Sequence, residues 1–363
     1  MRVDRLWVTD FRSWAAAELR FAPGLTAIVG ANGQGKTNLV EAIGYLATLS
    51  SFRGAPTDAL VRVGAERAVV RAEVDRDDRS LLVEAEIVPG GRNRVQVNRQ
   101  RLARSRDLLG ALRVSVFSPD DLELVKGGPA GRRRYLDDAL VASHPRHDRT
   151  RADVDRVLRQ RNALLRQAGG RLTADVAATL DVWDARLAAA GEALADARAE
   201  LVASLAPAVT RAYAALAEPG GASGRVEAML AYAPAWRPGG LGAALAAARA
   251  DELRRGVSLV GPHRDDVELD IGGLPARTHA SQGEQRSLAF ALRIAAHAVV
   301  TEVVGTPPVL VLDDVFSELD PERSAALVRE LPAGQTVLTT AGVLPTGTEP
   351  ELVLRLADGR VLE

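Results

Sequence analysis

Eight consecutive residues near the N-terminus have the types and spacing of a phosphate-binding loop. Residues 30–37 read Gly-Ala-Asn-Gly-Gln-Gly-Lys-Thr, the complete pattern G-x-x-x-x-G-K-[ST]. The glycines let backbone N–H groups point at phosphate oxygens, Lys36 brings positive charge to the outer phosphates, and Thr37 offers a hydroxyl to Mg²⁺. We therefore expect a nucleoside triphosphate to be bound by Gly30, Ala31, Asn32, Gly33, Gln34, Gly35, Lys36, Thr37 and Asn38.

The residues on either side of this loop predict the elements that the motif requires. Residues 25–29 form a short apolar, β-branched run, as in a buried strand, and residues 38–47 place apolar side chains at helical spacing. The start of that helix adds unpaired N–H donors and the positive end of a helix dipole. A glycine-rich turn that carries Lys-Thr by chance is the alternative, and these flanks disfavour it.

A second acidic motif lies far along the chain. The apolar run 309–312 follows two prolines and ends at Asp313 and Asp314, which is a Walker B pattern. The run predicts a central parallel strand whose carboxyl end reaches the phosphate site. Asp313 is expected to bind Mg²⁺ opposite Thr37, and Asp314 to orient or deprotonate the attacking water, with Lys36 as the other catalytic residue. A strand end capped in solvent is the alternative.

A third motif narrows the class of nucleotide-binding protein to which the chain can belong. Ser281, Gln282, Gly283 and Glu284 open an amphipathic helix and resemble the signature motif of ABC-type ATPases. In that family the motif grips the γ-phosphate bound by the opposite subunit, so physically it is a second anion site at a helix N-terminus. Ser281 and Glu284 also have the spacing of a capping box, and both interpretations can hold at once.

Two further loops of that family are only partly matched by this chain. Residues 315–320 resemble the D-loop, with Ser317 and Asp320 as its site residues, whereas the histidine switch expected after the next strand is missing. Threonines end that strand instead, and Thr340 offers only a polar contact. A glutamine lid residue is not evident either, and residues 117–121 occupy its expected place.

Bulk properties limit the protein class. The chain has 363 residues, 46 basic and 47 acidic side chains and no cysteine, so net charge does not indicate nucleic-acid binding and disulfides are excluded. Neither a secretory leader nor an apolar run of membrane-spanning length is evident, which predicts a cytoplasmic protein without a membrane partner.

The order of elements predicts an α/β fold: a P-loop ABC-type ATPase head with a mixed sheet, flanking helices and an inserted helical arm. Residues 1–125 are expected to form the N-terminal part of the head and 126–254 the arm. Residues 255–363 are expected to complete the head with the signature, Walker B motif and D-loop. Within the arm, breaks are expected at residues 168–170 and 218–221, and a long helix with an apolar seam between them.

The combined motifs resemble the RecF family of bacterial recombination mediators over nearly the whole chain. The stretch between Lys36 and Ser281 is longer than in transporter subunits and far shorter than the coiled coils of SMC proteins. The matching segments are Leu6–Ser13, Asn38–Ile43, Ser51–Arg53, Phe117–Asp137, Gly261–Asp266 and Ser281–Arg286, besides the phosphate loop.

This resemblance implies a protein that binds ATP and Mg²⁺ and dimerises when ATP is bound. Slow, DNA-dependent hydrolysis would reset it. It further implies binding to double-stranded DNA and gapped single-strand/double-strand junctions, work with RecR and RecO to load RecA, and a part in replication and the SOS response.

The DNA contacts are the least specific expectation. Arg53, Arg132, Arg133 and Arg134 are the candidates, and His263 is expected to be structural or interfacial and not a metal ligand. Two other functions stay open: an ABC subunit that energises a membrane transporter, and a scaffold that binds ATP without meaningful hydrolysis. The long arm and the absent histidine switch disfavour the first, and the paired aspartates disfavour the second.

Overall fold

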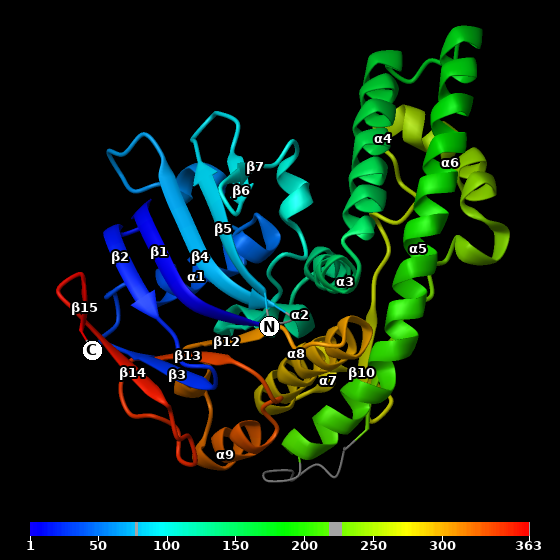
Figure 1. Cartoon of the computed structure of the whole chain (residues 1–363). Coiled ribbons are helices and arrows are strands. Elements are labelled where there is room, and N and C mark those ends of the chain that lie inside the picture. The colour runs from blue at the N-terminus through cyan, green and yellow to red at the C-terminus, as the bar shows by residue number, and fades with distance from the viewer. Residues whose placement is uncertain (77–78, 218–226, 363) are drawn as a thin grey trace.

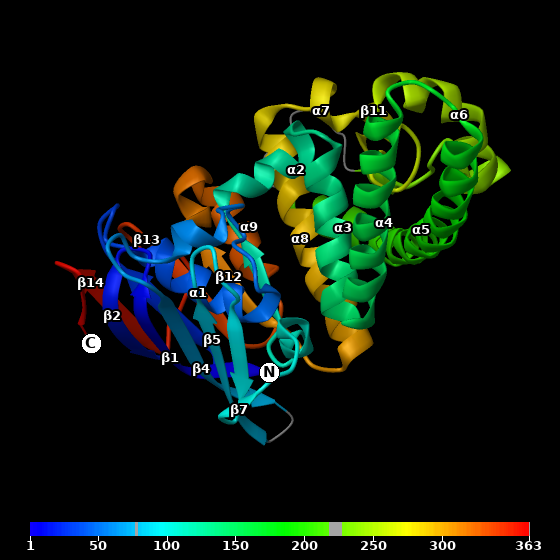
Figure 2. The ribbon, with the colours of Figure 1, turned by 90° about the horizontal axis from the view of Figure 1, so that it is seen from above.

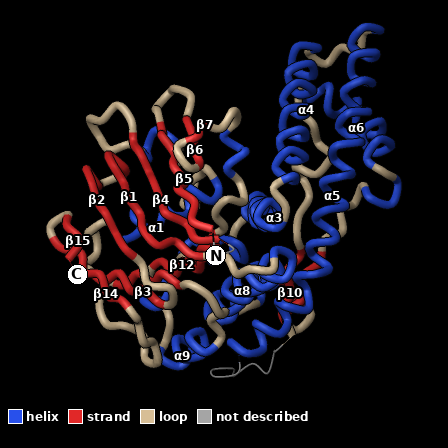
Figure 3. The backbone as a smooth tube through the Cα atoms, viewed as in Figure 1, coloured by secondary structure: helices blue, strands red, loops and turns tan. Residues whose placement is uncertain are grey.

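The computed structural model describes residues 1–76, 79–217 and 227–362. Two six-stranded sheets form a head on one side of the molecule, and long helices form an arm on the other (Figures 1 and 3). The N-terminal and C-terminal segments of the chain meet in the head, and the middle of the chain supplies the arm. This arrangement agrees with the predicted fold class.

The first sheet carries the phosphate-binding loop. Its strand order is β15-β14-β3-β13-β12-β8, and all neighbours are parallel except β14 and β15, which form a C-terminal hairpin. The central strand β12 is buried along its whole length, as predicted from its continuous apolar run. The bounds are β3 Leu25–Val29, β8 Val114–Phe117, β12 Val309–Asp313, β13 Thr336–Thr340, β14 Leu352–Ala357 and β15 Arg360–Leu362.

The second sheet is antiparallel and covers the head. Its order is β2-β1-β4-β5-β6-β7, and β6 and β7 form a hairpin. The bounds are β1 Arg2–Phe11, β2 Trp14–Arg20, β4 Ala68–Arg76, β5 Arg79–Ile87, β6 Arg94–Val97 and β7 Gln100–Arg101.

Helix α1 (Lys36–Thr48), which follows the phosphate loop, lies between the two sheets and contacts strands of both. Successive residues of β12 point to opposite faces of its sheet: Val309 and Val311 join the core around α1. Leu310 and Leu312 join the core around α8 (Gln282–Val304). The Walker B strand is therefore held from both sides by apolar packing.

The arm is built of helices that lie on the side of the molecule away from the two six-stranded sheets (Figure 2). Two of them, α4 (Arg146–Ala168) and α5 (Ala174–Ala217), run side by side (Figure 1). The break predicted at 168–170 separates α4 from α5. The predicted apolar seam lies on α5. The break predicted at 218–221 lies outside the described residues. The bounds are α3 Pro129–Ser143, α4 Arg146–Ala168, α5 Ala174–Ala217 and α6 Leu241–Arg255.

A small sheet in the arm was not predicted. Strand β9 (Ala228–Ala231) lies in a stretch expected to be helical, and it pairs with β10 (Glu268–Ile271), which pairs in turn with β11 (Leu274–Pro275). Alanine-rich composition favoured a helix there, but tertiary pairing decided the conformation. Residues 268–271 were expected to belong to the head. The expected boundary at 254/255 therefore separates β9 from β10, although the two strands pair in one sheet.

Helix α8 is long and apolar enough to cross a membrane by length and composition, although no such run was noted in the sequence. However, 56% of the most apolar 18-residue stretch of this helix is buried inside the protein, and the helix packs against α5. It is thus the central helix of the core between head and arm. The remaining helices are α2 Glu123–Lys126, α7 Ala276–His279 and α9 Pro321–Arg329.

Candidate nucleotide site

The phosphate-binding loop has the backbone that its glycines allow. Gly33 and Gly35 have φ values of 84° and 85°, a region that other residues rarely adopt. The Lys36 ammonium donates to the carbonyl oxygens of Gly30 at 2.7 Å and of Ala31 at 3.1 Å. Residues 31–33 are exposed, so the loop is open to a ligand.

The turn between β1 and β2 supports this loop, a role that sequence reasoning missed. The Trp14 indole Nε1 donates to the Gly35 carbonyl at 3.1 Å, and the Asn38 amide donates to the Ser13 hydroxyl at 2.8 Å. A Cβ atom on Gly35 would lie 2.6 Å from Trp14 Nε1, so only glycine fits there. The resemblance of residues 6–13 to the RecF family was the available signal.

An interior ion pair fixes the same turn to α1. Arg12 binds Glu41 through two hydrogen bonds of 2.7 Å, and the Glu41 side chain is fully buried. The charge is therefore paired and hydrogen-bonded where an unpaired carboxylate would be costly. This contact holds the β1–β2 turn over the start of the helix.

The Walker B residues reach the loop as predicted. The Thr37 hydroxyl donates to Asp313 Oδ1 at 3.0 Å. Burial raises the pKa of Asp313, and hydrogen bonds from Thr339 and Thr37 oppose that shift. Hydroxyl and carboxylate oxygens are the donors that Mg²⁺ prefers, so this pair fits the expected cation.

Asp314 lies in an unusual position. Its φ is 53°, in the left-handed region, and its Oδ1 atom is buried with no hydrogen-bond partner among the described residues. Strained backbone and unpaired buried oxygens occur together at functional sites. Asp314 thus has the environment expected of a residue that awaits a substrate or a water.

The signature motif lies at an exposed helix start. Ser281 caps α8 by accepting from the Glu284 N–H, and Glu284 accepts from the Ser281 N–H, which is the predicted capping box. Ser281 and Gln282 remain exposed. Gly283 packs under the Arg323 guanidinium, where an added Cβ would lie 2.5 Å from Arg323 Nη1. Ser281 and Gln282 are therefore the part of this helix start that is open to another molecule.

The residues assigned to the D-loop lie between Walker B and signature. The Ser317 hydroxyl donates to the Asp314 carbonyl at 2.8 Å, and Asp320 caps α9 by accepting from the Arg323 N–H at 2.8 Å. Since Arg323 also covers Gly283, this segment connects the two motifs.

Where ABC-type ATPases have a histidine switch, this chain has two threonines with different contacts. Thr340 Oγ1 lies 3.5 Å from the Val343 carbonyl, whereas Thr339 contacts both Walker B aspartates. Residues 117–121 occupy the place expected for the glutamine lid residue. In this segment Asp121 is buried and pairs with Arg293.

The arginines proposed as DNA contacts divide into two groups. Arg132 is 7% exposed and binds Asp266 through two hydrogen bonds of 2.7 and 2.8 Å, and Arg133 donates to the Asp265 carbonyl. Arg132 is thus corrected from a DNA candidate to an interior ion pair, because its guanidinium is already saturated. Arg53 and Arg134 are exposed, Arg133 is half-buried, and these three remain candidates.

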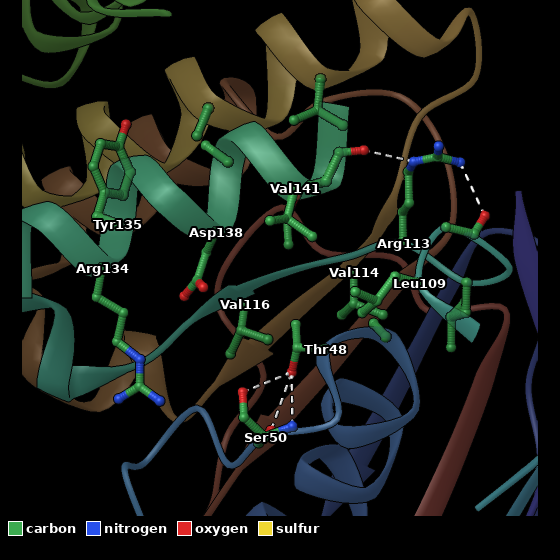
Figure 4. A pocket seen from close by; sticks show the side chains of 18 of the residues that line it. Thr48, Ser50, Leu109, Arg113, Val114, Val116, Arg134, Tyr135, Asp138 and Val141 are labelled. Carbon is green, nitrogen blue, oxygen red and sulfur yellow. Dashed lines mark hydrogen bonds between the residues drawn. The ribbon is translucent and has the colours of Figure 1, made fainter. Parts of the chain in front are cut away.

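Arg134 also lines a cavity of about 300 Å³ between the head and the arm, shown in Figure 4. Its walls come from the end of α1, from β8 and from α3, and Asp138 faces it 3.5 Å from Arg151. The phosphate-binding loop does not line this cavity.

His263 is half-buried in the loop between α6 and β10. Its Nε2 lies 3.1 Å from the Ser258 carbonyl, and burial lowers the pKa of the imidazole. Among the described residues no group of three or more His, Cys, Asp and Glu side chains is arranged to hold a metal ion. The structural interpretation of His263 is consistent with these contacts.

Fold and site together define an ABC-type ATPase head with an inserted helical arm. The family model "RecF/RecN/SMC N terminal domain" matches residues 2–339. SMC head structures share this fold, for example the SmcHead bound to the C-winged helix domain of ScpA, with a TM-score of 0.58 and 17% identity over 99% of this chain and 96% of that one.

More similar relatives define the family further. The DNA replication and repair proteins RecF of Streptomyces avermitilis and Frankia alni are each 48% identical, over 94% of this chain and 94% of each relative. A solved structure of the recombination mediator protein RecF with ATP, in the RecFOR pathway, has a TM-score of 0.89 and 28% identity over 99% of this chain and 96% of that one. The chain belongs to the RecF family.

Replacement of Lys36 tests the role of the loop. We expect Lys36→Ala to abolish ATP binding, because the loop loses the only charge that it directs at the outer phosphates. Equilibrium binding of a fluorescent ATP analogue measures this. Lys126→Ala, at the end of α2, is the matched control. Undiminished binding by the Lys36 variant would contradict the assignment.

Proposed function

We propose that this protein is an ATP-switched, DNA-binding recombination mediator that acts in DNA replication and repair. ATP and Mg²⁺ would bind at the phosphate loop, Thr37 and Asp313, and binding would favour a homodimer on double-stranded or gapped DNA. Hydrolysis would be weak, DNA-dependent and assisted by Asp314, and would reset the protein. Family membership and the ATP-containing relative support this proposal.

One observation supports the proposed ATP-dependent dimer: the molecule has two incomplete anion sites that complement each other. The phosphate loop offers N–H groups and Lys36, and the exposed start of α8 offers Ser281, the Gly283 N–H and the positive end of a 23-residue helix. Two copies related by a twofold axis would join each loop to the other copy's helix, with ATP between them.

The other assignments follow from this proposal. Residues 1–125 and 255–363 would act as the ATPase head and residues 126–254 as the arm, except that β10 and β11 complete the small sheet of the arm, and α8 would join head and arm. RecR, RecO and RecA are the proposed partners in a cytoplasmic pathway, with a role in the SOS response. Arg53, Arg133 and Arg134 are the proposed contacts to DNA phosphates, which would be sequence-independent and sensitive to salt.

The alternative of a transporter subunit has no specific observation in its favour. Within the described part of the chain, the one helix with membrane-like composition is the core helix α8. Co-purification with a membrane permease would nevertheless revive this alternative.

Size analysis with ATP, ADP or no nucleotide, with and without gapped DNA, tests the proposal. We expect dimers only with ATP, and tighter DNA binding by dimers than by monomers. Ser281→Arg should abolish dimers while leaving ATP binding intact, because the loop is unchanged. Ser204→Arg, an exposed serine on α5, is the control and should behave as wild type.

Mixing two variants sharpens this test. Ser281→Arg keeps an intact loop and Lys36→Ala keeps an intact signature, so one mixed pair contains one complete composite site. Dimers that form in the mixture, but in neither variant alone, would support nucleotide sharing between copies. ATP-independent dimers, or a Ser281→Arg protein that dimerises normally, would contradict it.

A further inference from the structure

We infer that Thr339 is a positioning residue that holds both Walker B aspartates from the neighbouring strand, an inference that rests on the proposed ATPase function. Its hydroxyl donates to Asp313 Oδ1 at 2.8 Å and accepts from the Asp314 N–H at 3.0 Å. One side chain thus contacts the expected metal ligand and the expected catalytic residue at the same time.

The sheet places Thr339 for this task. Strands β12 and β13 are parallel neighbours, and Asp313 is the register partner of Thr339. Thr339 is 1% exposed, so solvent does not compete for its hydroxyl. The Thr339 carbonyl oxygen also lies 3.3 Å from the Asp314 nitrogen. The Asp314 N–H thus has two acceptors on Thr339, its hydroxyl and its carbonyl, and both hold Asp314 in its left-handed conformation.

The choice of residue type supports a function beyond packing. A buried strand position accepts valine as well as threonine, because both are β-branched and of similar size. The hydroxyl is what this site uses, since it satisfies two polar groups at once. The hydroxyl of Thr340, the next residue of the same strand, instead contacts its own loop, at the Val343 carbonyl and the Gly342 N–H.

The contact also fixes which carboxylate oxygen remains available. Thr37 and Thr339 both donate to Oδ1 of Asp313, which leaves Oδ2 outside this arrangement. Thr37 and Asp313 are themselves the expected cation ligands. Thr339 is therefore the group that orients Asp313 from outside the ligand set, as outer hydrogen-bond partners commonly do at metal sites.

Three variants test the inference: Thr339→Val removes the hydroxyl and keeps the shape, Thr339→Ser keeps the hydroxyl, and Thr340→Val is the matched control. The measurement is binding of a non-hydrolysable ATP analogue at increasing Mg²⁺ concentrations. We expect Thr339→Val to need roughly 10-fold more Mg²⁺ for half-maximal binding, with unchanged binding without Mg²⁺. Thr339→Ser and Thr340→Val should follow the wild type.

The outcomes separate this inference from the proposed function. If the wild-type protein does not bind the analogue, the proposed function fails and the inference fails with it. If the wild type binds but Thr339→Val shows the wild-type Mg²⁺ requirement, only the inference is overturned. A purely structural role would lower the melting temperature of the nucleotide-free protein and leave the Mg²⁺ requirement unchanged. Should the valine variant not fold, Thr339→Ala replaces it under the same criteria.

Discussion

Asp314→Asn is expected to bind ATP and form dimers while its hydrolysis falls by roughly 100-fold or more. The amide has nearly the shape of the carboxylate but does not accept a proton from the attacking water. The Asp314 Oδ1 atom is buried and has no partner in the described part of the chain, so it is available for this role. Because the phosphate loop and Asp313 are unchanged, nucleotide binding should persist.

Single-turnover hydrolysis and size analysis of the same sample measure both parts of this prediction. Asp251→Asn, an exposed aspartate on α6, is the control and should hydrolyse ATP as the wild type does. Normal turnover by Asp314→Asn would show that another group activates the water. Loss of ATP binding would instead assign Asp314 to the structure of the site.

Arg161→Met is expected to destabilise the arm by about 3–5 kcal/mol, the usual cost of removing one partner of a buried ion pair. Arg161 is fully buried on α4 and joins three other segments of the arm. Its guanidinium donates to Asp184 at 2.6 Å, to Glu252 at 2.6 Å and to the Ser258 hydroxyl at 2.8 Å. Without the arginine, the fully buried Glu252 loses its cation and the N–H donor to its Oε2 atom, while the Leu259 N–H still donates to Oε1.

Hydrogen exchange of α4, α5 and α6 measures this loss locally, which suits a protein whose head and arm need not unfold together. Arg156→Met is the matched control, because Arg156 lies on the same helix but pairs with Asp153 at the surface. A surface pair of this kind contributes less than about 1 kcal/mol. Equal protection in the two variants would contradict a structural role for the buried cluster.

The motif-bearing parts of the fold were predictable because their signals are local. The phosphate loop, the strand before it and the capping box at Ser281 are each set by consecutive residues and short-range hydrogen bonds. The side chains of β12 point alternately into two different apolar cores. This could not be predicted from the sequence, because a continuous apolar run does not indicate which helix covers each face of the sheet.

The arm was predicted less well for a related reason. Its alanine-rich sequence indicates helix throughout, yet residues 228–231 form a strand because β10 supplies a partner 40 residues later in the sequence. Arg132 was read as a surface cation from its place in an arginine run, but Asp266 lies opposite it in space. Charge in a sequence does not reveal whether a counter-ion lies nearby.

The amino-acid sequence by itself determined the class of site: a phosphate cradle, a pair of aspartates after a buried strand and a serine-capped helix. Each is encoded in a short segment whose backbone geometry follows from its own residues. Only the tertiary structure decided how these segments are supported, through Trp14 under Gly35, Arg12 on Glu41 and Thr339 beside Asp313. Those contacts join residues far apart in the chain, so they depend on strand order and packing that no local pattern specifies.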